Sequence, residues 1–109
     1  MMRKAIVFMH DLEAGLLSED ESGYHFCYDT RYLALSNIEP ISLTLPLQES
    51  EFTSNILFPF FDGLIPEGWL LEVAERNWKI NQRDRMGLLL ACCKDCIGAV
   101  SIHEIIIEV

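Results

Sequence analysis

The alternation of apolar and polar residues is clearest in the first third of the chain. Residues 4–10 are rich in β-branched and aromatic side chains, and in residues 24–29 aromatic positions alternate with His, Cys and Asp. A period of two residues is typical of a strand with one buried face. Gly15 and the polar stretch 18–23 supply turns. The pattern therefore predicts a meander of consecutive short strands over residues 4–34.

A further strand is predicted between two prolines. In residues 41–45, Ile and Leu alternate with Ser and Thr, and Pro40 and Pro46 bound the segment. Proline is tolerated at the ends of strands because it cannot donate a ladder hydrogen bond. Residues 48–55 show no apolar period, so we expect a surface loop or an irregular connection there.

From Ile56 the spacing of apolar residues becomes helical. Pro66 suits a first helical turn, and the apolar residues that follow at helical spacing are Leu70, Val73, Ala74 and Trp78. A helix is therefore predicted over residues 66–78. A second helix is predicted over residues 86–93, with Asn81 or Asp84 as its cap and Gly98 near its end. Residues 100–109 then form a terminal strand.

Strands followed by two helices and a returning strand predict an α+β fold, with two helices packed on one side of a small, mostly antiparallel sheet. The length of 109 residues is that of one domain, so we expect residues 1–109 to share one core. Half of the residues are hydrophobic, which is enough apolar surface to offset the chain entropy lost on folding.

The net charge of −9 argues against general binding to nucleic acid, because the phosphate backbone would be repelled. Most of the acid precedes residue 66, whereas residues 76–94 carry five basic residues and a single acidic one. Such a dipolar molecule is suited to electrostatic steering toward a protein partner. No apolar run reaches the ~20 residues of a membrane span or forms a signal-peptide core, so the cytoplasm is the default expectation.

Motifs for catalysis and cofactor binding are not found. No glycine pair opens a G-x-G-x-x-G loop, and although Gly63 and Gly68 have the spacing of a P-loop, Trp69 and Leu70 stand where lysine and a hydroxyl residue are needed. The three histidines lie in or beside strands and accompany no nucleophile motif. We therefore expect no enzyme activity and no cofactor, with structural roles for the histidines.

Cysteines leave one alternative open. Cys93 and Cys96 form a C-x-x-C, which Cys27 with His25 or His103 could complete as a zinc site. The pair follows a helix, however, where the dipole disfavours the thiolate that redox chemistry needs. Small reduced residues packed in a core are the favoured interpretation, and no disulfide or metal is expected.

Trp69 stands apart on the first predicted helix. On a helical wheel it points away from the apolar cluster and toward Glu72 and Arg76. An exposed tryptophan is enriched among interface anchors, so Trp69 is a candidate hot spot for a partner. The alternative is that this first-turn side chain folds back over the phenylalanines at positions 58–61.

Several segments resemble a known family. Residues 59–68, Pro-Phe-Phe-Asp-Gly-Leu-Ile-Pro-Glu-Gly, are similar to the "PFFDNLLPEG" segment of the N-terminal domain of HipA-type toxin kinases. Residues 28–33, 41–47 and 95–100 resemble that domain's remaining motifs in the same order. Cys93 departs from the pattern, because the family often has glycine there. The resemblance covers nearly the whole chain.

The resemblance implies a function as well as a fold. The family's kinase core would follow this domain, so the chain looks like the domain alone and resembles HipS of three-gene HipBST toxin–antitoxin modules. That implies an antitoxin that binds and inhibits a HipT-like serine/threonine kinase, with a HipB-like helix-turn-helix protein as a further partner. A structural subunit that completes the kinase fold and bridges it to the DNA-binding protein is the alternative.

A partner-binding site follows from this resemblance together with the wheel. The helix that carries Trp69 is expected to dock at or near the kinase's active site. The residues expected to form the site are Gly63, Glu67, Gly68, Trp69, Glu72 and Arg76.

Overall fold

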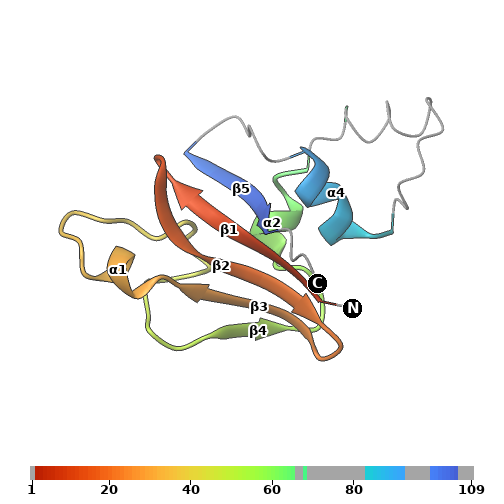
Figure 1. The fold of residues 1–109 in the computed structure, drawn as a ribbon, viewed down its shortest axis with the longest axis horizontal. Coiled ribbons are helices and arrows are strands. Elements are labelled where there is room, and N and C mark those ends of the chain that lie inside the picture. Colours follow the sequence, from red (N-terminus) through yellow and green to blue (C-terminus); the bar gives the residue numbers. More distant parts are fainter. Residues whose placement is uncertain (1, 66–67, 69–82, 93–98, 106–109) are drawn as a thin grey trace.

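The computed structural model describes residues 2–65, 68, 83–92 and 99–105, and Figure 1 shows how they are arranged. The strands are β1 (Arg3–Met9), β2 (Leu12–Asp20), β3 (Gly23–Tyr28), β4 (Phe52–Ser54) and β5 (Val100–Ile105). The helices are α1 (Thr30–Leu33), α2 (Pro59–Asp62) and α4 (Arg85–Cys92).

The strands form one antiparallel sheet in the order β4-β3-β2-β1-β5. His10 and Asp11 connect β1 to β2 with positive φ angles of 49° and 68°. Two such residues make the tight hairpin turn whose twist matches that of the strands. The predicted meander is confirmed for β1, β2 and β3, and β5 adds to the free side of β1 from the far end of the sequence. The turn predicted at Gly15 is wrong, because Gly15 lies within β2 and pairs with Tyr28 of β3.

One face of the sheet carries the core. Ala5, Val7 and Met9 alternate with partly exposed residues along β1 and are buried against the helices. Phe61 of α2 and Leu88 and Leu89 of α4 belong to the same buried cluster. Helices α2 and α4 lie near β5, while α1 lies at the other end of the sheet (Figure 1). The predicted α+β fold, with helices covering one side of an antiparallel sheet, is confirmed.

The strand predicted over residues 41–45 is wrong. The segment is a turn in which the backbone N–H of Leu45 donates to the carbonyl of Ser42 at 3.1 Å, closed by a single bridge between these residues. The hydroxyls of Ser42 and Thr44 also lie 2.9 Å apart. Ile41 and Leu45 are buried, whereas Leu43 at the tip is 95% exposed. The alternation therefore reflects the two ends of a turn.

Helix α1 and strand β4 are short elements that the sequence pattern did not predict. Residues 30–33 form helix α1, because the carboxylate of Asp29 accepts the backbone N–H of Arg31 at 2.7 Å and caps it. The expected loop over residues 48–55 contains β4, whose Phe52 ring lies 6.2 Å from the ring of Phe26 on β3. Neither element extends beyond four residues, so neither produces a readable period.

The C-terminal predictions agree with the described residues. Helix α4 coincides with the predicted helix to within one residue at each end, and Asp84 caps it by accepting the backbone N–H of Gly87 at 3.1 Å. Strand β5 begins where the terminal strand was predicted. The helix predicted over residues 66–78 lies outside the described residues except for Gly68, which is helical. Among the described residues no helix is long and apolar enough to cross a membrane.

Candidate partner-binding site

The elbow, residues 58–65, precedes the segment in which the sequence places the partner-binding helix. Pro59 begins α2, where its missing N–H costs nothing, and the N–H of Gly63 closes the turn on the Pro59 carbonyl at 2.9 Å. Phe61 is fully buried, with its ring centroid 5.6 Å from that of Phe26 on β3. Phe58 and Ile65 are buried as well. The elbow is therefore fixed on the sheet by aromatic packing.

An ion pair links the elbow to α4. The guanidinium Nε of Arg85 donates to Oδ1 of Asp62 at 2.5 Å. Asp62 ends α2 and Arg85 begins α4, so the pair joins the two elements that flank residues 66–82. Both side chains are partly exposed, so we expect the pair to add little to the free energy of unfolding. Its main effect is to hold the end of α2 next to the start of α4.

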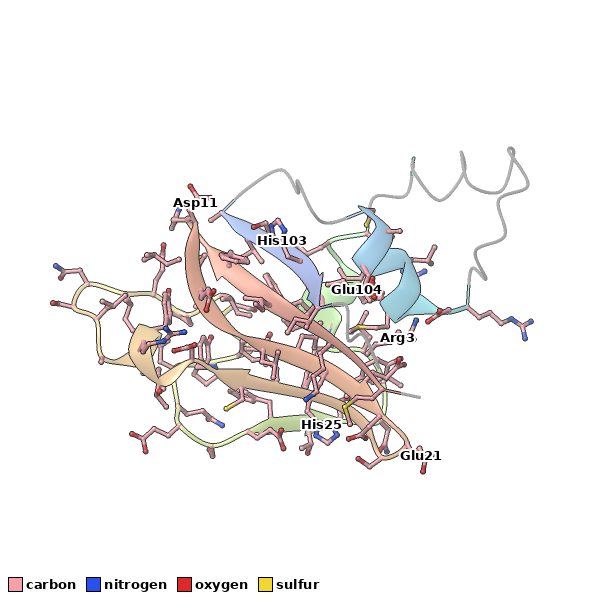
Figure 2. The ribbon with its side chains drawn as sticks, viewed as in Figure 1. Arg3, Asp11, Glu21, His25, His103 and Glu104 are labelled. Atoms are coloured by element: carbon pink, nitrogen blue, oxygen red, sulfur yellow. The ribbon has the colours of Figure 1, made fainter. Side chains whose placement is uncertain are left out.

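A second charged group anchors the start of α4 to the sheet. Arg3 of β1 donates to both carboxylate oxygens of Asp84, at 2.8 and 2.7 Å, and its Nε donates to Glu19 of β2 at 2.6 Å. Arg3 lies close to α4 at the end of β1 (Figure 2). The hydrogen bonds from Arg3 lower the pKa of Asp84, and those to Asp84 raise the pKa of Arg3. Asp84 thus caps α4 and binds it to β1 and β2.

Two of the predicted site residues are described. Gly63 is exposed and ends α2 in the right-handed region, with φ of −69°. Gly68 is exposed, and a Cβ built on it would meet no atom within 4 Å. Backbone exposed in this way permits close approach of a partner chain. Glu67, Trp69, Glu72 and Arg76 lie outside the described residues.

Ser22, His25 and Asp20 form a hydrogen-bonded group, with Oε2 of Glu51 3.4 Å from Nδ1 of His25, that resembles a catalytic arrangement only at first sight. Oγ of Ser22 donates to Asp20 Oδ1 at 2.6 Å, and Nε2 of His25 lies 3.2 Å from the same oxygen. Asp20 raises the pKa of His25, while Ser22 and His25 lower the pKa of Asp20 to about 2. With the imidazole donating to Asp20, it cannot also accept the Ser22 proton. The group instead ties the β2–β3 turn to the segment before β4.

The remaining candidate chemistry is described in part. His103 packs edge-on against Phe8, with ring centroids 5.0 Å apart, and His10 pairs with Glu39 at 3.1 Å. Cys27 and Cys92 are half-buried, whereas Cys93 and Cys96 lie outside the described residues. Within the part of the chain that the structure describes, no three His, Cys, Asp or Glu side chains are gathered to hold a metal ion.

Sequence reasoning missed the charged residues that hold the elbow and α4. Arg3 and Asp84 are 81 residues apart, and Asp62 and Arg85 are 23 apart, so no local pattern joins them. Asp84 was visible only as a candidate helix cap. Its second role depends on β1 and α4 meeting in the folded chain.

Comparisons with known proteins agree with this architecture. The sequence profile of the HipA N-terminal domain matches residues 5–103. The chain belongs to the HipA N-terminal domain family. In structure it is similar to the "N-terminal domain of HipA toxin", with a TM-score of 0.76 and 32% sequence identity, covering 97% of this chain and 95% of that one. It is also 38% identical over 104 residues to an "uncharacterized protein" of Haemophilus influenzae (strain ATCC 51907 / DSM 11121 / KW20 / Rd), covering 95% of this chain and 94% of that protein.

Membership of the HipA N-terminal domain family fixes the class of protein. The matched structure is the N-terminal domain of a HipA toxin, and this homology points to a HipA-related toxin–antitoxin component. It also implies association with HipA-like toxin partners. The elbow lies within the matched residues, so its packing belongs to the shared domain.

Proposed function

We propose that this protein is an antitoxin that binds a HipA-like serine/threonine kinase toxin, of the HipT type, and inhibits it. The observation that carries the proposal is the match to the Haemophilus influenzae relative, 94% of which is covered by this one domain. That relative contains little besides the HipA N-terminal domain. A domain made as a separate polypeptide acts on a kinase only by binding it, so the binding surface decides the function.

The elbow supplies a rigid base for that surface. The buried Phe61 fixes the elbow on the sheet, and the Asp62–Arg85 pair ties the elbow to helix α4. Binding through a segment whose two ends are already held costs less conformational entropy than binding through a free loop. This supports a partner site that begins at the exposed Gly63 and Gly68 and continues along the segment.

Trp69 is proposed as the anchor within this segment, with Glu67, Glu72 and Arg76 as polar neighbours. A large aromatic side chain buried at the centre of an interface dominates binding energy, while polar groups at the rim exclude water. Insertion of this anchor at or near the kinase's active site would prevent phosphorylation. A HipB-like DNA-binding protein is the proposed third component of the complex.

A phosphorylation assay tests inhibition directly. The HipT-like kinase is incubated with its substrate in the presence of increasing amounts of the full-length protein, and phosphate transfer is measured. We expect transfer to fall to a low plateau at stoichiometric amounts. Transfer that stays unchanged or rises would contradict inhibition and would favour a structural subunit that completes the kinase fold.

Replacing Trp69 with alanine tests the anchor. Trp69→Ala is expected to weaken kinase binding by about 2 kcal/mol or more, which is about 30-fold in Kd, without loss of the folded state. Binding is measured by isothermal titration calorimetry. Leu43→Ala is the matched control, because Leu43 is 95% exposed on the turn at residues 41–45 and no binding role is proposed for it. Equal affinity of the two variants would refute the role of Trp69.

A further inference from the structure

Two adjoining hollows are lined by residues of α1 and its neighbours. Helix α1 lies at the end of the sheet remote from α4 (Figure 1). One hollow has a volume of about 390 Å³ and an apolar lining that includes Met9, Leu12, Tyr32 and Leu35. A second hollow of about 280 Å³ shares Leu12, Tyr32 and Leu35 with the first. We call the two together the α1 groove. Leu12 and Leu35, which line both hollows, are 49% and 47% exposed, so the groove presents apolar surface to solvent.

The walls of the α1 groove are held by specific contacts. Tyr32 is 2% exposed, its ring stacks on that of Tyr28, and its hydroxyl donates to the carbonyl of Glu39 at 2.7 Å. Nε2 of His10 lies 3.1 Å from Oε1 of Glu39, joining the β1–β2 turn to the loop after α1. Both sides of the groove are therefore fixed to each other before any ligand arrives, which lowers the entropy cost of binding.

The rim of the groove is acidic. Glu13 and Glu39 line the groove, and Asp11 lies between the lining residues His10 and Leu12 in the sequence. Asp29 lies next to the lining residue Arg31, whose guanidinium is within 3.3 Å of both Glu13 and Asp29. Asp11 stands at the tip of the β1–β2 turn and points into solvent (Figure 2). One arginine does not balance four carboxylates, so the rim has a surplus of negative charge. Opposite charge on a partner would be attracted there.

We propose that the α1 groove docks a basic segment of a protein partner. An aliphatic side chain of that segment lies between Leu12 and Leu35, and its lysine or arginine residues face Asp11, Glu13 and Glu39. Apolar anchoring supplies the affinity, and charge complementarity selects basic over acidic segments. The groove is remote from the elbow and α4, so this partner binds while the elbow remains free for the kinase.

Peptide titration tests the proposal on the intact protein. The probe is a short peptide with leucine at its centre and a Lys-Arg pair on each side. Binding is followed by changes in the backbone amide NMR signals of Leu35, Asn37 and Glu39. We expect saturable shifts at these amides, and about a fivefold or greater loss of affinity when salt rises from about 50 to about 300 mM. A peptide with glutamate pairs should not bind.

Substitutions in the α1 groove then separate the apolar contribution to peptide affinity from the charged contribution. Leu35→Ser is expected to weaken the basic peptide about tenfold, and Glu39→Lys about fivefold. Leu43→Ser removes an exposed leucine outside the groove and should leave affinity unchanged, while thermal unfolding checks that each variant remains folded. Trp69→Ala should keep full peptide affinity, and Leu35→Ser should keep kinase inhibition.

Three results would overturn the proposal. The first is the absence of shifts at the groove amides with the basic peptide. The second is equal binding of the basic and acidic peptides, which would show that charge plays no part. The third is a shift of the same amides with protein concentration alone, together with dimer formation in analytical ultracentrifugation, since the groove would then bind a second copy of this chain.

Discussion

Gly68 and Gly87 are both helical, but their surroundings give a substitution to alanine different effects on stability. A Cβ at Gly87 would lie 2.4 Å from Oδ2 of Asp84 and 3.2 Å from a guanidinium nitrogen of Arg3. Asp84 cannot simply rotate away, because it is held by two hydrogen bonds from Arg3 and by the N–H of Gly87 itself. At Gly68 the same methyl group would meet no atom within 4 Å. The same substitution therefore has opposite consequences at the two positions.

Alanine at these two positions is predicted to change the free energy of unfolding in opposite directions. Gly68→Ala should raise the free energy of unfolding by up to about 1 kcal/mol, because alanine is the better helix former. Gly87→Ala should lower it by about 1 kcal/mol or more, because the added methyl displaces Asp84 from Arg3 and from its cap. Urea unfolding at neutral pH measures both. Destabilisation by Gly68→Ala would show that the residue is not in open space.

At the scale of the elements, the contact between β1 and α4 depends on one ionised carboxylate. Arg3 lowers the pKa of Asp84 from its ordinary value of 3.8. A carboxylate whose pKa is lower in the folded state adds stability that is complete above its ordinary pKa and is lost as pH falls through the folded value. The attachment of α4 to the sheet is therefore expected to weaken in acid, below about pH 3.8.

The substitution Asp84→Asn separates the two roles of Asp84, which are its ion pair with Arg3 and its cap on the N-terminus of α4. Asparagine caps helices about as well as aspartate, so the variant loses the ion pair and keeps the N-terminal hydrogen bond. The variant should be less stable than the parent protein at pH 7, and the difference should shrink as pH falls below about 3.8. Denaturant unfolding across that pH range gives the comparison. A difference that does not change with pH would show that Asp84 has no linked proton.

Long elements were predictable from sequence, and short or non-local ones were not. The alternation in β1 and β3 and the apolar run in α4 extend over six or more residues, so their periods are readable. Residues 41–45 imitate a strand because both ends of a turn point into the core. Helix α2 and strand β4 depend on partners elsewhere, chiefly Phe26, which no local period reveals. In the candidate site, the glycines could be read from sequence, whereas the Arg3–Asp84 and Asp62–Arg85 pairs could not.

At the scale of the whole molecule, the strands of the sheet differ in how many neighbouring strands they pair with. Strand β1 is paired along its length with β2 on one side and β5 on the other, whereas β4 has three residues and pairs with β3 alone. Local opening is easiest where few hydrogen bonds and contacts must break. Among the strands of the sheet, β1 and β2 at its centre are therefore expected to be the most stable and β4 at its edge the least.

Hydrogen–deuterium exchange measured by NMR is predicted to follow this order. The amides of Ala5 and Val7 in β1 should exchange most slowly, near the limit set by global unfolding, and those of β4 should exchange fastest among the strands. Exchange of β5 together with β1 would fit cooperative opening of the sheet centre. Faster exchange in β1 than in β4 would contradict the pairing described here.

The pairing of β1 with β5 has a consequence during synthesis on the ribosome. Strand β1 is synthesised long before its partner Val100–Ile105, so one edge of β1 stays unpaired while the residues between them are translated. Long sequence separation also slows the closing step. Interrupted products that stop before Val100 should be substrates for proteases and chaperones, so the supply of folded protein depends on the synthesis of Val100–Ile105.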